Sequence, residues 1–200
     1  LTARLTQWLE LAPEQRHPVE VRLAATVMIV RDRAPGDPGD PGHPRDPRDP
    51  SGGPVEVFML HRASTMAFAP DTLVFPGGGV DPRDGDESIP WRGANDLLWS
   101  ARLGDTPKHA RMFVCAAIRE LFEETGVLLA GPAHSDELVD SGTPEWQEIR
   151  GQLVSRQISL AHVLHERRLV LRSDLLRAEA HWVTPEFEAK RFDTRIFAAI

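Results

Sequence analysis

The stretch RELFEETGV, residues 119–127, sets an arginine and three glutamates on a helical pattern that ends in a glycine. At 100° per residue, one side of the helical wheel is largely apolar and the other is charged. The apolar side carries Val114, Ile118, Leu121, Phe122 and Thr125, and the charged side carries Arg119, Glu120, Glu123 and Glu124. Gly126 is suited to the left-handed cap that ends a helix. We therefore expect a helix over 108–125 that buries one face and presents its acids on the other.

The three glutamates lie within about one helical turn, and Glu120 and Glu124 are four residues apart. Like charges at this spacing destabilise a helix by a few tenths of a kcal/mol per pair, so something must offset their repulsion. Arg119 is placed to pair with Glu123, which would leave Glu120 and Glu124 aimed outward together. Two interpretations stay open at this point. One is a solvated acidic face, and the other is a site for Mg²⁺ or Mn²⁺, which prefer carboxylate ligands.

The segments around this helix alternate between strand and helix patterns. Apolar, β-branched runs predict strands at 21–33, 55–63, 71–80, 127–130, 180–185 and 191–200. Helical periodicity follows Thr143 and Ser159, two expected N-caps. Residues 34–54 repeat Pro, Gly and Asp and are expected to form a flexible loop, and 81–108 is expected to be part loop and part short helix. This order predicts an α/β or α+β fold with a mixed sheet between helices.

Composition limits the functional class. The 200 residues are 41% hydrophobic, which suits one domain, and the net charge of −7 argues against a nucleic-acid partner. The single cysteine, Cys115, lies in an apolar helical run, favours a buried thiol over a nucleophile and fits a reducing, cytoplasmic compartment. No run is long enough for a membrane span, and no signal-like apolar region is present. The apolar C-terminal run RIFAAI leads us to expect a chain truncated at its C-terminus.

With AAI before it and FPGGGV upstream, RELFEETGV resembles the second half of the Nudix box, the signature of hydrolases that act on a nucleoside diphosphate linked to another moiety. That signature is Gly, five residues, Glu, seven residues, then Arg-Glu-apolar-x-Glu-Glu-x-Gly-apolar, and the second half matches throughout. The first half departs from it. Arg119 lies 41 positions after Gly78 rather than 14, so an insertion falls within the box at about 84–108. The first glutamate of the box has three candidate counterparts, Asp84, Asp86 and Glu87.

The insertion, the segment VFPGGGVDPRD and the later HWVTPEFEAKRFDTRIF (181–197) are similar to the branch of the family that cleaves coenzyme A. The resemblance runs from about residue 25 to the end of the chain, skipping the proline-rich loop. In that branch the chain continues past this last strand, and family members often use a further acid from late sequence. Any fourth carboxylate therefore stays unassigned.

The resemblance implies a Nudix-like mixed sheet between helices and a metal-dependent hydrolase in one domain, 1–200. The implied Mg²⁺ or Mn²⁺ ligands are Glu120, Glu123, Glu124 and the carbonyl of Gly78. Catalytic roles fall on Glu120, as general base, and on Glu123 and Arg119. Substrate contacts are expected at Arg62, Phe75, Gly77 and Gly79, with a surface cation and a core ring as the plain alternatives for Arg62 and Phe75.

The implied reaction is attack of water on one phosphorus of a pyrophosphate, with a cation neutralising the developing charge. From coenzyme A or an acyl ester, the products are a phosphopantetheine and adenosine 3′,5′-bisphosphate. Two alternatives remain. The chain could cleave a nucleotide sugar, dinucleotide or oxidised nucleotide instead, or it could be a catalytically silent binding module. Dimers are common in the family, so a homodimer is one assembly that the resemblance allows.

Three further patterns favour plain structural roles. His162 and His165 with Glu166 could suggest zinc, but a polar helix face is the simpler interpretation. Arg191, Asp193 and Arg195 alternate along one strand and predict an ion-paired ladder or a wall of the site. The tryptophans are expected to pack in the interior, and they are Trp91, Trp99, Trp146 and Trp182.

Overall fold

A mixed β-sheet forms the framework of the protein in a computed structural model that describes residues 2–32, 55–62 and 71–200. The order along the main path is β2-β1-β10-β9, and β5 also pairs with β1. β1 runs parallel to β10 and antiparallel to β2 and β5, while β9 is antiparallel to β10. The strands are β1 (Val21–Asp32), β2 (Val55–Phe58), β5 (Gly77–Gly79), β9 (Leu176–Val183) and β10 (Arg191–Ala199). The expected α/β fold with a mixed sheet is confirmed.

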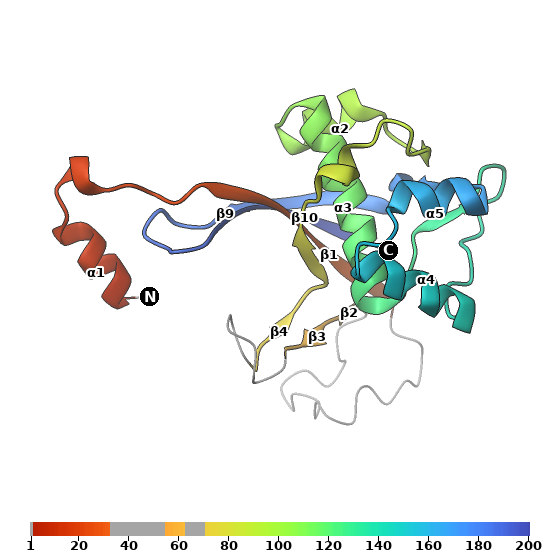
Figure 1. Ribbon diagram of the computed structural model, residues 1–200, viewed down its shortest axis with the longest axis horizontal. Helices are drawn as coiled ribbons and strands as arrows, with labels where there is room; N and C mark the ends of the chain where they lie inside the picture. The colour runs from red at the N-terminus through yellow and green to blue at the C-terminus, as the bar shows by residue number, and fades with distance from the viewer. Residues whose placement is uncertain (1, 33–54, 63–70) are drawn as a thin grey trace.

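The helix expected over 108–125 is α3 (Pro107–Thr125), which crosses the middle of the molecule beside β1 (Figure 1). It begins where the Thr106 side chain accepts a hydrogen bond from the backbone N–H of His109. It ends at Gly126, whose φ of 82° is the left-handed conformation that glycine adopts without strain. Its apolar residues are almost fully buried, as the periodicity predicts, and Cys115 is among them with no exposed surface.

The segment between β5 and α3, which contains the expected insertion, is folded and packs on α3. It holds the short helix η2 (Pro82–Gly85), β6 (Trp91–Arg92) and α2 (Asp96–Leu103). Asn95 caps α2 by accepting from the backbone N–H of Leu98. Trp99 of α2 is fully buried and meets Phe197 of β10 edge to face, with ring centroids 5.9 Å apart. The insertion therefore extends the core rather than looping into solvent.

Two further helices and a small sheet complete the body on the side of α3 away from the arm described below (Figure 1). They are α4 (Pro144–Val154), α5 (Leu160–Arg167), β7 (Ala130–Pro132), β8 (Leu169–Arg172) and η3 (Ser173–Leu175). β8 lies between β6 and β7. Ser159 caps α5 as expected, by accepting from the backbone N–H of His162. Thr143 precedes α4 as expected but makes no side-chain capping hydrogen bond.

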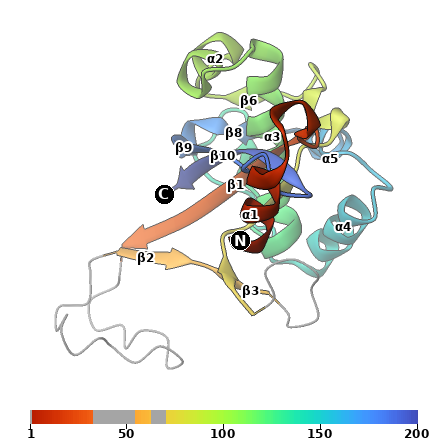
Figure 2. The ribbon, with the colours of Figure 1, turned by 90° about the vertical axis from the view of Figure 1, so that its left-hand side faces the viewer.

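An arm projects from the body, and no sequence pattern identified its helix. α1 (Thr2–Glu10) lies at its far end, beyond η1 (Pro13–Gln15), beside the turn that joins β9 to β10 (Figures 1 and 2). Arg4 of α1 and Glu188 of that turn form an ion pair of 2.6 Å. None of the described helices is long and apolar enough to cross a membrane.

Several expectations need correction. The strand expected at 55–63 breaks into β2 and β3 (Leu60–His61), and β3 pairs with β4 (Leu73–Val74). The strand expected at 127–130 is displaced to Ala130–Pro132. Trp182 was expected in the interior but is 63% exposed, because β9 is the outer strand of the sheet at that point. The proline-rich loop expected at 34–54 lies outside the described residues.

Candidate active site

Arg119 is the centre of the candidate site, and it is buried rather than solvent-facing. Its Nε and Nη2 donate to the two carboxylate oxygens of Asp84, each at 2.9 Å, and Asp84 itself is 2% exposed. Nη2 also donates to the carbonyl oxygen of Gly79, at 2.9 Å. Burial alone would lower the pKa of Arg119, but the hydrogen bonds and charge of Asp84 outweigh it and raise that pKa above its ordinary value. One guanidinium therefore holds η2 and the glycine strand β5 against α3.

Asp84 resolves the open question of the first box acid. Of the three candidates, Asp84 is the one that reaches Arg119, while Asp86 bonds the nearby backbone N–H of Ser88. Asp84 also accepts the backbone N–H of Asp81 at 2.8 Å, which closes the first turn of η2. Asp84 lies six residues after Gly78, which is the spacing between glycine and the first acid in the Nudix box. The inserted residues therefore come after Asp84.

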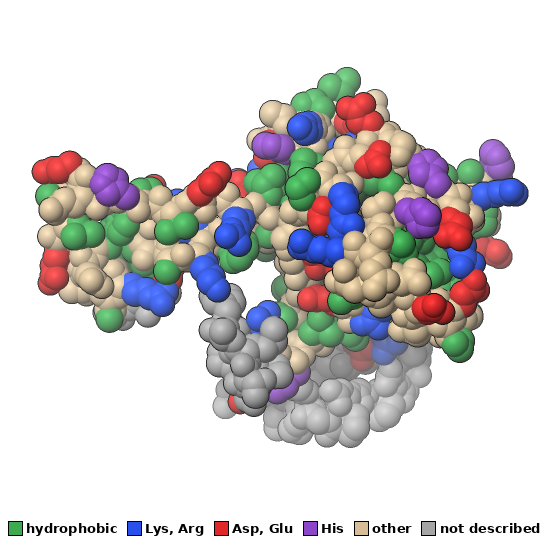
Figure 3. Space-filling model, viewed as in Figure 1, with side chains coloured by type: hydrophobic (Ala, Val, Ile, Leu, Met, Phe, Trp, Pro, Cys, Tyr) green, Lys and Arg blue, Asp and Glu red, His purple; other side chains and the backbone are tan. Residues whose placement is uncertain are grey.

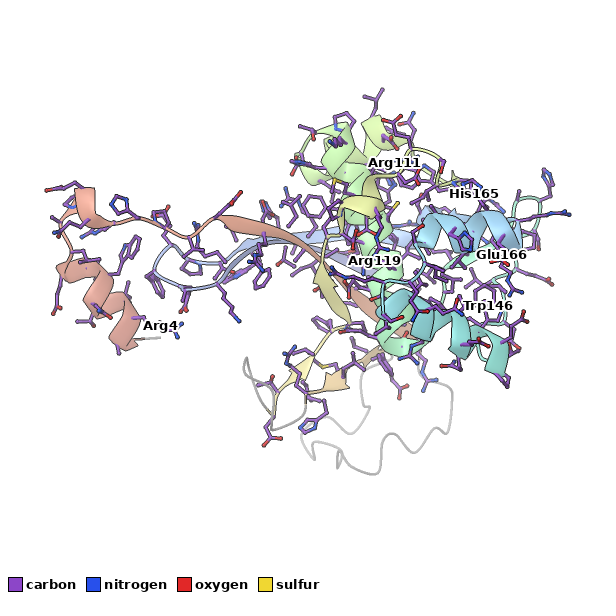
Figure 4. The ribbon with its side chains drawn as sticks, in the orientation of Figure 1. Arg4, Arg111, Arg119, Trp146, His165 and Glu166 are labelled. Atoms are coloured by element: carbon purple, nitrogen blue, oxygen red, sulfur yellow. The ribbon has the colours of Figure 1, made fainter. Side chains whose placement is uncertain are left out.

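The third nitrogen of Arg119 reaches two of the three helix glutamates. Nη1 donates to Glu120 at 2.8 Å and to Glu123 at 3.2 Å. The ion pair expected between Arg119 and Glu123 is thus present, but it is the weaker part of a larger network. Glu120 was expected to point freely outward, but its carboxylate accepts a hydrogen bond from Arg119. Arg119 is labelled on α3 in Figure 4.

Glu120 lies directly against the glycine strand. A Cβ atom at Gly78 would sit 2.5 Å from Oε2 and 2.6 Å from Oε1 of Glu120, so only glycine allows this approach. The Glu120 side chain is 12% exposed. Burial raises the pKa of Glu120, Arg119 opposes that rise, and the charges of Glu123 and Glu124 add to it. A second positive charge beside Glu120 would be favourable here.

Glu124 meets the same strand one residue earlier. Its Oε2 accepts the backbone N–H of Gly77 at 2.8 Å. Burial raises the pKa of Glu124, while the Gly77 N–H and the positive charge of Arg62 oppose the rise. Glu120 and Glu124, from consecutive turns of α3, therefore both face β5.

The other residues predicted to contact substrate lie in the glycine strand β5 or just before it. Phe75 is half-buried just before β5 and stands outside the core cluster. A Cβ at Gly77 would lie 2.5 Å from the Ala25 carbonyl oxygen, whereas at Gly79 it would meet nothing within 4 Å. Gly77 is thus required by the close approach of β1, and Gly79 is open toward a cleft.

That cleft has a volume of about 540 Å³ and begins at the glutamates. Its lining includes Gly79, Arg119, Glu120 and Glu123. Basic side chains are visible where the arm joins the body (Figure 3). A volume of this size suits a small ligand, since such sites usually measure about 300–1,000 Å³.

The donor set fits a hard divalent cation. Two carboxylates and the backbone of a three-glycine strand gather at one place, and oxygen donors of this kind suit Mg²⁺ or Mn²⁺. Within the described ranges, no three acidic, histidine or cysteine side chains are already grouped as a set of metal ligands. The carboxylates instead engage Arg119 and the Gly77 N–H. The ligand set Glu120, Glu123, Glu124 and Gly78 stays a prediction.

The alternative polar clusters have structural partners. On α5, His162 lies 3.4 Å from Glu166, and His165 reaches Ser88, which agrees with a polar helix face (Figure 4). On β10, Arg195 is 3% exposed and pairs with Asp193 and Asp105. The expected ladder is present only between Asp193 and Arg195, because Arg191 donates instead to the backbone carbonyls of Thr184 and Val19. None of the three residues lines the cleft, so they are not a wall of it.

The mixed sheet carries the glutamate helix α3, and the buried Arg119–Asp84 pair holds that helix against the glycine strand β5. This arrangement is the one expected of a Nudix-type hydrolase domain. Comparison with known proteins agrees with this. A solved structure of a NUDIX hydrolase from Alicyclobacillus acidocaldarius superposes with a TM-score of 0.64 and 27% identity, over 90% of this chain and 70% of that one. The resemblance to the Nudix hydrolase family found in the sequence is therefore confirmed by a similar solved structure.

Two curated proteins are also similar. Nudix hydrolase 7 of Caenorhabditis elegans is 44% identical over 72 residues, which is 36% of this chain and 17% of that protein. The acyl-coenzyme A diphosphatase NUDT19 of Xenopus laevis is 25% identical over 178 residues, 71% of this chain and 46% of that protein. The chain thus spans less than half the length of either relative. No protein-family model matches it.

Proposed function

We propose that the protein is a divalent-cation-dependent diphosphatase that hydrolyses coenzyme A or its acyl esters. The observation that carries the proposal is the approach of Glu120 and Glu124 to the glycine strand beside a cleft, with Arg119 held by Asp84 behind them. The similarity to a protein named acyl-coenzyme A diphosphatase supports this choice of substrate.

In this proposal Glu120, Glu124 and the Gly78 carbonyl hold the cation, and Glu123 is either a third ligand or a group that Arg119 orients. When bound, the cation supplies positive charge against the charge that develops on the pyrophosphate oxygens. Glu120 accepts the proton of the attacking water. Arg119 is a positioning residue, because its guanidinium is already committed to Asp84, Glu120 and Glu123.

The reaction adds one water across the pyrophosphate. An oxygen of water bonds to one phosphorus, and the bond from that phosphorus to the bridging oxygen breaks. Coenzyme A then yields 4′-phosphopantetheine and adenosine 3′,5′-bisphosphate. Arg62, whose positive charge acts on the Glu124 carboxyl, would contact a phosphate oxygen. Gly79, which lines the cleft, would border the substrate with Phe75 and Gly77. A cytoplasmic location and a homodimer stay predictions.

The test is product analysis by chromatography and mass spectrometry, with Mg²⁺ or Mn²⁺ present. Wild type, Glu124→Gln and Glu148→Gln are each offered coenzyme A, an acyl-coenzyme A, ADP-ribose, NADH and 8-oxo-dGTP. Glu148 is a matched control, because it is an exposed acid on α4 outside the cleft. We expect adenosine 3′,5′-bisphosphate from wild type and Glu148→Gln, and none above background from Glu124→Gln.

Preferred cleavage of ADP-ribose, NADH or 8-oxo-dGTP would keep the hydrolytic chemistry and reject coenzyme A as substrate. Activity in Glu124→Gln equal to wild type would reject the assigned site. No activity on any of the five compounds would favour a binding module.

A further inference from the structure

The cleft that begins at the glutamates ends on two neighbouring strands of the central sheet. Arg22 of β1 and Phe192 of β10 are partners in the parallel ladder, and both line the cleft. Side chains at paired positions of adjacent strands lie on the same face of the sheet. A guanidinium and a phenyl ring therefore stand side by side within the same cleft as Glu120 and Glu123.

The arginines of the cleft differ in how far their charge is already neutralised. Arg119 is bound by Asp84, and Arg83 donates from Nε and Nη2 to Asp81, each at 3.0 Å. The side chain of Arg22, by contrast, makes no hydrogen bond or ion pair with any described residue, and Arg22 is exposed. Its charge is thus available for an anionic ligand.

A second accessible cation comes from the connection between α4 and α5. The side chain of Arg156 is 78% exposed, and among the described residues the acid that it reaches is Asp81, at 3.9 Å. Its backbone has a φ of 60°, a left-handed conformation that is uncommon for arginine. Arg83 secures this turn by donating from Nη1 to the carbonyl oxygens of Arg156 and Ile158, at 3.3 Å each. The turn is therefore fixed at the edge of the cleft.

Phe192 is likewise held in place, although its side chain is only half-buried. Its backbone N–H donates to Oγ1 of Thr184 at 3.0 Å, and its carbonyl accepts the Thr184 N–H at 2.9 Å. An aromatic ring at the wall of a cleft can stack on a nucleobase, an interaction worth about 1–3 kcal/mol. An adjacent guanidinium suits a phosphate, which it binds through several N–H donors.

We propose that Arg22 and Phe192, with Arg156 beside them, form the subsite for a nucleotide that carries a phosphate on its ribose. In coenzyme A this is the adenosine 3′-phosphate. The base packs on Phe192, and the ribose phosphate binds Arg22, with Arg156 as the second cation. This inference rests on the proposed function and adds a reason for its substrate: a nucleotide without the extra phosphate would leave Arg22 unused.

The test measures binding without turnover, by calorimetric titration of the full chain with adenosine 3′,5′-bisphosphate and with AMP, in Mg²⁺. The proteins are wild type, Arg22→Gln, Phe192→Leu and the control Lys108→Gln. Lys108 is an exposed cation in the first turn of α3, it does not line the cleft, and its loss changes net charge by the same amount.

Wild type and Lys108→Gln should bind the bisphosphate about tenfold more tightly than AMP, the size expected for hydrogen bonds to a charged group. In Arg22→Gln that preference should vanish while AMP affinity is kept, and Phe192→Leu should weaken both ligands. Thermal melting checks that each variant is folded.

A preference for the bisphosphate in Arg22→Gln equal to that in Lys108→Gln would overturn the subsite, even if coenzyme A is hydrolysed normally. Failure of the proposed function has a different signature, because it appears as cleavage of another pyrophosphate by wild type. Equal wild-type affinity for AMP and the bisphosphate would also overturn the subsite, whichever compound is cleaved.

Discussion

Arg119 and Asp84, 35 residues apart in the chain, form a two-pronged ion pair in which both N–O distances are 2.9 Å. The exposed fractions of the two side chains are 9% and 2%. The pair joins the glutamate helix to the turn that follows the glycine strand. It thereby sets the distance between the two sides of the candidate site.

Asp84→Asn should lower the free energy of unfolding by about 3 kcal/mol. The substitution keeps the shape of the side chain but leaves a buried guanidinium without its main partner, and breaking such a pair typically costs about 3–5 kcal/mol. Glu120 and Glu123 still contact Arg119, so the low end of that range is expected. Urea unfolding curves measure the difference.

Asp86→Asn is the matched control, because Asp86 is also an acid of this segment but does not bond Arg119. A change within about 0.5 kcal/mol is expected, as for most surface substitutions. If both variants unfolded at the same urea concentration, the ion pair would not be the link that we describe.

Gly78→Ala should reduce kcat by about 100-fold, whereas Gly79→Ala, at a position expected to border the substrate, should change KM and leave kcat nearly unchanged. An alanine Cβ at 78 would lie 2.5 Å from the Glu120 carboxylate, and displacement of a catalytic group by about 1 Å can cost that much. At Gly79 the same atom meets nothing within 4 Å. Steady-state assays on the preferred substrate compare the two. Equal activities would show that the approach of Glu120 to β5 is not needed for turnover.

The sequence was sufficient for the helix and its acids, because helical periodicity and the Gly126 cap are local signals. It was not sufficient for the partner of Arg119. Asp84, Asp86 and Glu87 lie within four residues, and only the turn of η2 determines which of them points at the helix. The pairing of the three glycines of β5 with β1 was likewise not predictable, since glycine has little strand propensity and β5 pairs only because β1 lies beside it. α1 carried no pattern that separates it from a coil.

Trp99→Ala and Trp182→Ala should differ by several kcal/mol in stability. The sequence assigned both to the interior, since composition alone does not show that Trp182 lies on an outer strand of the sheet. Trp99 is fully buried against Phe197, so its loss should cost about 3–5 kcal/mol. Trp182 is 63% exposed, and its loss should cost less than about 1 kcal/mol. Thermal unfolding of the two variants is the check, and similar melting temperatures would place Trp182 in a packed environment.

Mn²⁺ binding should depend on both glutamates that face the glycine strand. Each carboxylate that is lost removes an oxygen ligand and a negative charge, so Glu120→Gln and Glu124→Gln should each weaken Mn²⁺ by at least about tenfold. Titration of free Mn²⁺ followed by electron paramagnetic resonance measures this without any substrate, and Glu148→Gln should bind as wild type does. In parallel, a chelator should abolish hydrolysis and added Mg²⁺ should restore it. Hydrolysis that persists after complete chelation would contradict a catalytic cation held by Glu120 and Glu124. In that case the two carboxylates would act without the positive charge of a cation to offset their mutual repulsion.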